Sequence, residues 1–427
     1  MLIRILWTGD IHLGRRPTRL PETVDPYNLR PTSIWQSFVS VAIERKVDAV
    51  VLTGDIVDES NKFYEAFSVL HSGVRSLTAQ GIPVIAVSGN HDFDVLPRLS
   101  DQIPDFHLLG RGGQWQDYIL EQDGVSSVRF QGWSFPTRHV SYNPLAQYVP
   151  PSDELPTVGV LHCDCNVPRS IYGPVNLADL KARNPAAWLL GHVHKPTLLS
   201  ESYPLILYPG SLQGLDPGEP GAHGAWLVTL GTGRDPTAES LPLAGLRWEE
   251  IEVSLSQQDD ETSLERAVID ALRERHEKIC DEAGQTRTVG CRLRLIGRTG
   301  LHRRLPSLIP AIQSDLKPEF DDVAYFIEKI ENMSRPDISL EDIARTRDPA
   351  GLLAHRLLIL ERREPSSEYQ ELISNAKRPI EESQSKNQFL PLPNTGKPME
   401  EEKVRGLLLQ AGHRMPDSLL EQKETTK

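Results

Sequence analysis

The feature of this sequence that most constrains its fold is the alternation of short apolar runs with longer amphipathic stretches up to about residue 232. The short runs have the length and the branched side chains of buried strands, whereas the longer stretches carry apolar residues at helical spacing. This alternation is typical of an α/β domain. Strands are predicted at residues 2–7, 49–53, 84–87, 128–133, 157–161, 186–190, 205–208 and 225–230, and helices begin near residues 32 and 64.

We expect the chain to divide into three parts, because 427 residues exceed what one hydrophobic core usually organises. Residues 231–240, GTGRDPTAES, are polar and rich in turn-forming residues, which is typical of a linker. The predicted division is an α/β domain at 1–232, a small α+β domain at 241–345 and a C-terminal tail at 346–427.

The two later parts are predicted from shorter patterns. In the α+β domain we expect strands at 247–255 and 291–297 and helices at 263–277 and 321–330. In the tail we expect a helix at 351–361, linker-like sequence around FLPLPNTGKP and a short amphipathic element at 404–409. The tail is therefore predicted to be partly helical and partly linker.

Composition excludes several classes of protein. Four cysteines in so long a chain make no disulfide framework, and free thiols in a reducing cytoplasm are expected. The N-terminal residues carry no signal-peptide pattern, and no apolar run approaches the roughly 18 residues of a membrane span. The net charge of −13 does not exclude a nucleic-acid partner, because binding depends on a local basic surface.

Polar motifs follow five of the predicted strands. In chain order they are GDIHLG, GDIVD, GNHD, VLHCDC and GHVH. Loops at the carboxyl ends of strands in an open α/β sheet converge on one crevice, so we expect these side chains to meet. One such motif alone would be an ordinary turn, but five in succession predict a site. The candidate residues are Asp10, His12, Asp55, Asp58, Asn90, His91, Asp92, His162, His192 and His194.

The chemistry of these side chains indicates metal binding. Carboxylate, imidazole and amide ligands without a cysteine quartet suit divalent ions such as Mn²⁺, and the candidates are too numerous for one tetrahedral zinc. Two metal ions about 3.5–4 Å apart, holding the attacking and leaving oxygens of a phosphate ester, fit the set.

The order of these motifs resembles that of the calcineurin-like metallophosphoesterase superfamily over about residues 1 to 230. The resemblance implies a sandwich of two β-sheets flanked by helices. Within the superfamily, DIHLG is similar to the SbcD-type nucleases of double-strand-break repair. The stretch from VLHCDC to GHVHKP, together with YPGSLQG (208–214) and RLRLIGRTGLHRRL (292–305), is similar to the YhaO-like branch of bacterial DNA repair exonucleases.

The resemblance implies roles for individual residues. Asp10, His12, Asp55 and His194 would hold one metal ion, and Asp55 would bridge to a second ion completed by Asn90, His162 and His192. His91 would be the catalytic imidazole that protonates the leaving alkoxide or stabilises its charge. Asp58 would orient His91, and Asp92 would support the ligands from behind.

The resemblance also implies an activity and partners. The expected protein is a cytoplasmic, Mn²⁺-dependent DNA exonuclease of DNA repair that uses two metal ions. Its expected partners are DNA and a coiled-coil ATPase of the SMC or SbcC type, and a second copy of the chain is a further expected partner in a homodimer. Part of the ATPase docking surface is expected in the tail, where Leu353, Leu357 and Leu360 form an apolar stripe on the predicted helix. The alternative is that this stripe packs on the chain's own α+β domain.

A basic stretch in the α+β domain is the second functional candidate. Between residues 283 and 314 there is no acidic residue. Arginines there would give salt-dependent affinity for a phosphate backbone. The alternative is a solvated strand face paired with Glu249, Glu250 or Glu252. The candidate DNA-binding residues are Arg292, Arg294, Arg298, Arg303 and Arg304, and Arg287 lies in the same stretch.

Two other functions compete with a DNA nuclease. A phosphatase or phosphodiesterase for small phosphoesters would use the same metal site, although a small substrate needs no arginine-rich second domain. A non-catalytic scaffold would be expected to lack metal ligands or His91, and this sequence has both. Weaker substrate-contact candidates are Arg138, His139 and Tyr172, for which a solvated surface position is the favoured interpretation. Cys163 and Cys165 are expected to be buried thiols.

Overall fold

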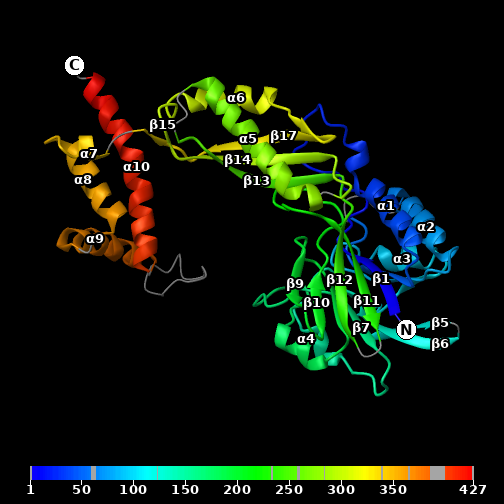
Figure 1. Cartoon of the computed structure of the whole chain (residues 1–427). Coiled ribbons are helices and arrows are strands. Elements are labelled where there is room, and N and C mark those ends of the chain that lie inside the picture. The colour runs from blue at the N-terminus through cyan, green and yellow to red at the C-terminus, as the bar shows by residue number, and fades with distance from the viewer. Residues whose placement is uncertain are drawn as a thin grey trace. The chain divides into compact units, whose positions relative to one another are not determined.

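The computed structural model describes residues 2–58, 64–122, 124–231, 234–256, 260–282, 284–337, 340–363, 366–384 and 400–425 (Figure 1). The chain forms two compact units. One unit comprises Met1–Glu252, Ile269–Arg294 and Pro310–Glu331, and the other comprises Val253–Val268, Leu295–Ile309 and Asn332–Lys427.

The first unit contains two six-stranded sheets. In the first sheet, the order β12-β11-β1-β2-β3-β4 places four parallel strands, β1 to β4, beside two antiparallel ones. The bounds of these strands are β1 Leu2–Thr8, β2 Ala49–Thr53, β3 Val84–Val87, β4 Phe106–Leu108, β11 Gly224–Gly231 and β12 Arg234–Pro242.

The second sheet has the order β5-β6-β7-β8-β10-β9. Its four central strands are parallel, and the two edge strands, β5 and β9, pair antiparallel. The bounds are β5 Gln116–Gln122, β6 Val125–Trp133, β7 Thr157–His162, β8 Ala187–Gly191, β9 Thr197–Ser200 and β10 Leu205–Tyr208.

Side-chain alternation along the strands builds the predicted sandwich. In β1, Ile5 and Trp7 pack into the apolar layer between the two sheets, whereas Leu6 packs on the opposite face with Trp35 and Phe38. Those two aromatic residues belong to the buried face of α1 (Pro31–Glu44), which lies beside α2 (Tyr64–Thr78) in Figure 1. The outer face of the second sheet packs against α4 (Leu177–Arg183). The expectation of two sheets flanked by helices is confirmed.

Shorter elements complete the first part of the chain. They are α3 (Leu96–Ser100) and the 3-10 helices η1 (Tyr27–Leu29) and η2 (Pro144–Gln147). Within the described residues, no helix combines the length and the hydropathy that crossing a membrane requires.

A third sheet follows, with the strand order β13-β14-β17-β16. Its strands are β13 (Leu246–Ser254), β14 (Thr288–Ile296), β16 (Glu319–Phe320) and β17 (Val323–Asn332). The connecting segments contain α5 (Glu261–Ile279), η3 (Cys280–Glu282) and α6 (Leu305–Asp315), and β15 (Arg298–Thr299) pairs in parallel with β18 (Arg335–Pro336). This part has the α+β character that the sequence predicted.

Two local predictions were wrong. Most of the predicted linker belongs to the edge strand β12, which pairs with β11. The pairing uses backbone hydrogen bonds, so the polar side chains of this segment gave no sign of a strand. The helix predicted at 321–330 is the strand β17, whose branched and aromatic residues Val323, Tyr325 and Phe326 are buried. The three-domain division itself stays a prediction.

The tail contains more helix than predicted. After α7 (Leu340–Ile343), the chain forms α8 (Pro349–Arg362), α9 (Ser367–Gln384) and α10 (Glu401–Thr425). The helix prediction at 351–361 agrees with α8, and the element predicted at 404–409 is part of α10. The linker prediction was wrong over α9, and FLPLPNTGKP lies outside the described residues.

The apolar stripe of α8 packs against neighbouring helices of the same chain. Leu357 lies in a small core with Leu340 and Ala354, and Leu360 packs with Tyr369 of α9 and Val404 of α10. Figure 1 shows α8 beside α10, which agrees with these contacts. Leu360 therefore packs among the helices of the tail. Leu357 packs against Leu340, which lies within the predicted α+β domain (241–345), and this contact agrees with the alternative that the stripe packs on the chain's own α+β domain.

Candidate metal centre

The seven predicted metal ligands lie at the carboxyl ends of parallel strands from both large sheets. Strands β1, β2 and β3 are neighbours in the first sheet, and β7 and β8 are neighbours in the second. The sandwich therefore presents both sets of loops at one edge. The residues are Asp10 and His12 after β1, Asp55 after β2, Asn90 after β3, His162 at the end of β7, and His192 and His194 after β8.

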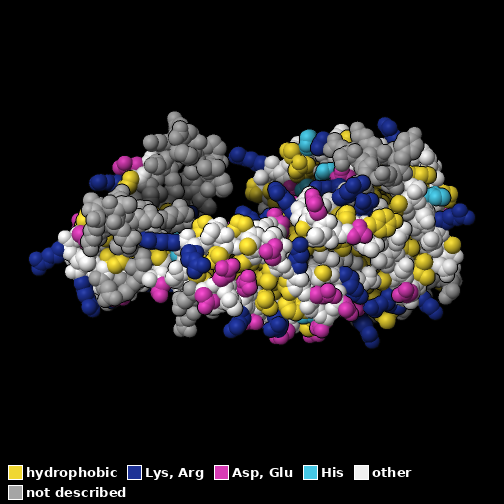
Figure 2. Space-filling view, turned by 90° about the horizontal axis from the view of Figure 1, so that it is seen from above, with side chains coloured by type: hydrophobic (Ala, Val, Ile, Leu, Met, Phe, Trp, Pro, Cys, Tyr) yellow, Lys and Arg dark blue, Asp and Glu magenta, His cyan; other side chains and the backbone are white. Residues whose placement is uncertain are grey.

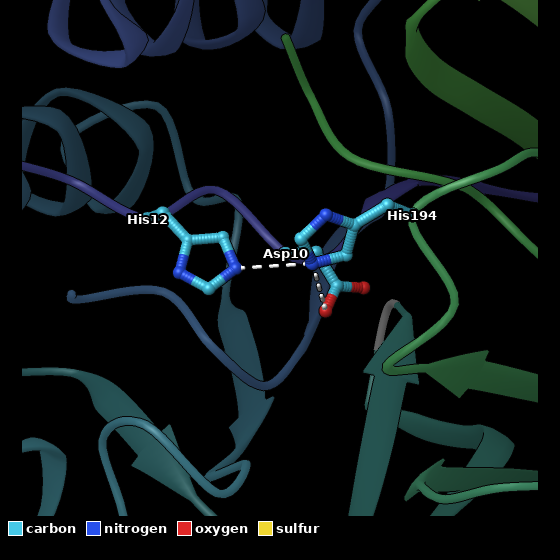
Figure 3. A group of neighbouring side chains, drawn as sticks. All are labelled: Asp10, His12 and His194. Atoms are coloured by element: carbon cyan, nitrogen blue, oxygen red, sulfur yellow. Dashed lines mark hydrogen bonds and ion pairs between the residues drawn. The ribbon is translucent and has the colours of Figure 1, made fainter. Parts of the chain in front are cut away.

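Asp10, His12 and His194 form the first group of ligands (Figure 3). His12 Nε2 lies 3.2 Å from His194 Nε2, and Asp10 Oδ1 lies 3.8 Å from the same His194 nitrogen. Figure 3 shows the two imidazole rings approaching each other, with the Asp10 carboxylate beside His194. One ligand atom from each residue lies within 4.8 Å of the others, a spacing suited to one divalent ion.

Asp55, Asn90, His162 and His192 form the second group. His162 Nε2 lies 3.4 Å from Asp55 Oδ2 and 3.1 Å from Asn90 Oδ1. Asn90 Oδ1 is also 3.2 Å from His192 Nδ1. His162 is fully buried, and Asp55 and Asn90 are nearly so. Two nitrogen and two oxygen ligands thus converge on one small volume.

The backbone is held in an unusual conformation at four of these positions. Asp10, His12, Asp55 and His192 have positive φ angles of 48°, 50°, 49° and 102°. Side-chain-bearing residues seldom adopt positive φ, and such residues cluster at functional sites where the surrounding structure enforces them. The His192 N–H donates to the Asp10 carboxylate at 3.0 Å, which joins the loops after β1 and β8.

Charges in the centre are strongly coupled. Burial raises the pKa of Asp10, whereas His162 holds the pKa of Asp55 well below its usual range against the effect of burial. Burial lowers the pKa of His162, but Asp55 and Asp10 outweigh it and raise that pKa to about 9. Burial and the charge of His162 lower the pKa of His192 to about 3. A bound divalent cation would favour the neutral form of His162, because a metal ligand must give up its proton.

The donor set fits divalent metal ions. It consists of carboxylate, amide and imidazole groups, and the described residues bring no cysteine into either group. These are ligands of borderline and hard divalent ions.

The three histidines that follow β7 and β8 each have a partner on the far side of the ring. Thr53 O accepts from His162 Nδ1 at 2.9 Å, which leaves His162 Nε2 facing Asp55. Glu219 Oε1 lies 2.8 Å from His194 Nδ1, and Asp164 Oδ1 lies 3.4 Å from His192 Nε2. Partners of this kind fix the ring orientation and the nitrogen available to a metal.

Glu219 and Asp164 were missed by the sequence analysis. Asp164 lies within the VLHCDC motif, two positions after His162. The sequence analysis considered only the two cysteines on either side of it. Glu219 lies 25 residues after His194 in the turn-rich segment LDPGEPG, which carries no signal of a ligand partner.

Asp92 joins the loops that follow β2 and β3 through hydrogen bonds. Its carboxylate accepts from Ile56 N at 2.7 Å and from Gly89 N at 2.8 Å. Burial and the nearby charge of Asp55 raise the pKa of Asp92 to about 7. At Gly89 a Cβ atom would collide with Asp55 Oδ1, so only glycine fits this turn. These contacts suit the predicted supporting role of Asp92.

His91 and Asp58 lie next to the first group. The His91 ring is 5.0 Å from the His12 ring, and His91 Nδ1 is a buried atom with no hydrogen-bond partner among the described residues. Burial lowers the pKa of His91, although Asp55 opposes this effect. Asp58 Oδ2 lies 3.4 Å from His12 Nδ1 and 3.6 Å from Arg15 Nε. Asp58 thus contacts His12, and its predicted control of His91 stays a prediction.

The weaker substrate-contact candidates and the two cysteines lie in different parts of the structure. Tyr172 packs against His192 with ring centroids 4.8 Å apart, so it borders the centre, and His139 packs against Tyr172 at 5.9 Å. Arg138 is exposed on the segment between β6 and η2. Cys163 is a buried free thiol, as expected, whereas the free thiol Cys165 is only half-buried.

The candidate DNA-binding arginines have acidic neighbours. Arg292 Nε donates to Glu328 Oε2 at 2.7 Å, and Arg294 pairs with Glu250 at 3.0 Å and with Glu331 at 3.9 Å. This is the paired strand face that the alternative predicted, although Glu249 pairs with Arg247 and Arg275 instead.

The remaining arginines lie after β14. Arg298 pairs with Glu361 at 3.2 Å. Arg303 and Arg304 are exposed on the segment that leads into α6. On the face drawn in Figure 2, basic side chains are interspersed with acidic ones. The DNA-binding role of all five arginines stays a prediction.

Comparison with known protein families identifies the class. Residues 3–196 match the calcineurin-like phosphoesterase family, and residues 248–335 match the middle domain of the metallophosphoesterase YhaO. The chain therefore contains a segment at 3–196 that matches the calcineurin-like phosphoesterases and a segment at 248–335 that matches the YhaO middle domain. The first of these families consists of metal-dependent phosphoester hydrolases.

The chain is also similar to individual curated proteins. The uncharacterized metallophosphoesterase YhaO of Bacillus subtilis is 27% identical over 247 residues, which are 57% of this chain and 60% of YhaO. The DNA double-strand break repair protein Mre11 of Aeropyrum pernix is 25% identical over 286 residues, which are 63% of this chain and 67% of that protein. The chain thus matches under two thirds of YhaO. The crystal structure of a Thermus thermophilus protein has a TM-score of 0.35 and 14% identity, covering 56% of this chain and 99% of that one.

Proposed function

We propose that this protein is a Mn²⁺-dependent DNA nuclease, an exonuclease of DNA repair that acts with two metal ions. The observation that carries the proposal is the convergence of Asp10, His12 and His194 in one group and Asp55, His162 and His192 in another, with the His91 ring beside them. The similarity to a protein named for DNA double-strand break repair supports DNA as the substrate.

The chemistry divides between metal ions and side chains. Bound metal ions would polarise the phosphate ester and lower the pKa of the attacking water. His91 would donate a hydrogen bond or a proton to the leaving oxygen, because its Nδ1 makes no hydrogen bond within the described residues. Asp55 would help to hold the metal ions. Its Oδ1 also accepts from His91 N at 2.8 Å, and this bond holds the catalytic loop beside the ligands.

The remaining parts would serve the polymer substrate. In this proposal, the α/β domain (1–232) cleaves DNA, the α+β domain (241–345) contacts its backbone through the arginines of the basic stretch, and the tail (346–427) contributes to partner docking. The partner would be an SMC-like coiled-coil ATPase, and the nuclease would act in the cytoplasm, with homodimers as a further assembly.

One experiment tests the proposal directly. Mn²⁺-dependent hydrolysis is measured with the full chain on single-stranded DNA, double-stranded DNA and a small chromogenic phosphodiester. Rapid release of nucleotides from DNA ends is the expected result. A chain that binds Mn²⁺ but leaves both DNA substrates intact would contradict the proposal.

A second candidate is a phosphatase or phosphodiesterase for small phosphoesters. The observation that favours it is the pairing of Arg292 and Arg294 with glutamates, which reduces the positive charge available to a DNA backbone. Turnover of small phosphoesters at rates far above those on DNA would support this candidate.

A further inference from the structure

Glu219 occupies a position that no motif indicated. It lies in the segment between β10 and β11, and its side chain is 15% exposed. Its Oε1 atom is 2.8 Å from His194 Nδ1. A carboxylate at this distance accepts a hydrogen bond from the Nδ1–H group of His194. The other ring nitrogen, Nε2, then faces Asp10 and His12.

The second carboxylate oxygen of Glu219 is also held. It accepts from the Ser211 hydroxyl at 2.9 Å and from Leu215 N at 3.1 Å. Behind it, the buried His223 ring lies 3.1 Å from the Glu219 carbonyl oxygen and 3.0 Å from the Ser211 hydroxyl. Because both oxygens are engaged, the carboxylate has little freedom to turn away from His194.

The loop that carries Glu219 is itself fixed to β13. The buried Gln213 side chain donates to Leu246 O at 2.9 Å, and Trp248 Nε1 donates to Gly214 O at 3.2 Å. Gly221 N donates to Trp248 O at 2.9 Å. These contacts hold the loop on both sides of Glu219. They also explain part of the YPGSLQG segment, whose Ser211 and Gln213 make two of the fixing contacts.

We propose that Glu219 is a positioning residue that orients His194 for the metal ion held with Asp10 and His12, and that β13 holds the Glu219 loop in place through Gln213 and Trp248. This inference rests on the proposed metal centre. It assigns a function in metal binding to the strand at which the match to the YhaO middle domain begins.

Metal affinity tests this inference without relying on turnover. The full chain is stripped of metal, and Mn²⁺ binding is measured by titration calorimetry and by the electron paramagnetic resonance signal of free Mn²⁺. In Glu219→Ala, we expect one Mn²⁺ site to weaken by about 10–100-fold, the usual effect of losing such a partner. The second site should keep its affinity.

Two conservative variants separate positioning from a structural effect. Glu219→Gln keeps an oxygen that accepts from His194 Nδ1 and should restore most of the affinity. Glu219→Asp keeps the charge but is one methylene too short to reach, so it should behave like Glu219→Ala. Glu201→Ala is the matched control, because Glu201 is exposed and in the same compact unit. Wild-type affinity in both Glu219→Ala and Glu219→Asp would overturn the inference.

The contribution of β13 is tested through Gln213→Ala, which should weaken the same Mn²⁺ site less than Glu219→Ala does. Unchanged Mn²⁺ affinity in Gln213→Ala would overturn the link to β13. Failure of the wild-type chain to bind Mn²⁺ would instead contradict the proposed function, so the two failures are distinguishable.

Discussion

The backbone N–H of His91 donates to Asp55 Oδ1 at 2.8 Å, so the loop of the proposed catalytic imidazole is fastened to the proposed bridging ligand. The bond uses the backbone and leaves the His91 ring free to face a substrate. In the proposed mechanism, metal binding and proton donation would therefore belong to different side chains, and substitutions can separate them.

Asp55→Ala should lose bound Mn²⁺ and all measurable hydrolysis, because one carboxylate would serve both ions. In the proposed mechanism, His91 lies beside the ligand His12 without itself holding a metal ion, so His91→Ala should keep both Mn²⁺ ions and lose about 10²–10⁴-fold in kcat. Bound metal is counted by mass spectrometry on the purified chains, and kcat is measured on the small phosphodiester. Comparable metal loss in both variants would show that His91 is a ligand rather than a catalyst.

Asp92→Ala should destabilise the protein. The substitution leaves Ile56 N and Gly89 N buried without acceptors, at a cost of about 1–3 kcal/mol for each. Asp92→Asn retains one oxygen acceptor and should lose roughly half as much stability. The free energy of unfolding is measured by urea denaturation of the metal-free chains. Equal stability of Asp92→Ala and wild type would remove Asp92 from the support of this loop.

Much of this fold could be predicted because the strands are bounded by clear signals. The strands at 49–53, 84–87 and 205–208 agree with the structure at both ends, since each is a continuous apolar run stopped by glycine, serine or proline. The edge strand β12 had no such signal, because its pairing with β11 uses backbone groups and its side chains are largely exposed.

The candidate site was predictable to the extent that its residues directly follow strands. Asp10, His12 and Asn90 stand in short motifs at strand ends, so topology alone brings them together. Glu219 reaches the site through a loop whose course depends on contacts with β13, and sequence spacing cannot predict those contacts.

The ion pairs of Arg292 and Arg294 with glutamates determine which variants can test the role of these arginines in DNA binding. Charge reversal of Arg292 would set two glutamates against each other, so neutral Arg292→Gln and Arg294→Gln are the better variants. If these arginines contact phosphates, the double variant should bind duplex DNA more weakly. The slope of log affinity against log salt should fall by about 0.9 for each lost contact.

Glu328→Gln is the matched variant for this test. It releases Arg292 from its ion pair and should strengthen DNA binding if Arg292 reaches a phosphate. Dissociation constants are measured between about 50 and 200 mM salt, a range over which several phosphate contacts change the affinity by orders of magnitude. Hydrolysis of the small diester should be unchanged in the double arginine variant and in Glu328→Gln. An unchanged salt slope in the double variant would assign these arginines to structural ion pairs alone.

The tail packing changes how partner docking should be tested. Because Leu340 and Ile343 of α7 pack with α8, truncation after Arg347 would expose them, and truncation after Asp337 is cleaner. That cut breaks the ion pairs of Glu361 with Arg298 and Arg335, which cost about 0–1 kcal/mol each at a surface. The truncated chain should keep Mn²⁺-dependent hydrolysis and lose association with the proposed SMC-like ATPase partner.

Point variants distinguish a docking surface from the tail core. Leu352 and Leu407 are 52% and 42% exposed, so Leu352→Glu and Leu407→Glu should weaken ATPase association without lowering the melting temperature. Leu357 is 1% exposed, and Leu357→Ala should destabilise the tail by about 2–5 kcal/mol because it leaves a cavity. Association is measured by co-purification of each chain with the ATPase. Undiminished binding by the chain that ends at Asp337 would exclude the tail from the interface, because that chain lacks every residue of α7 to α10.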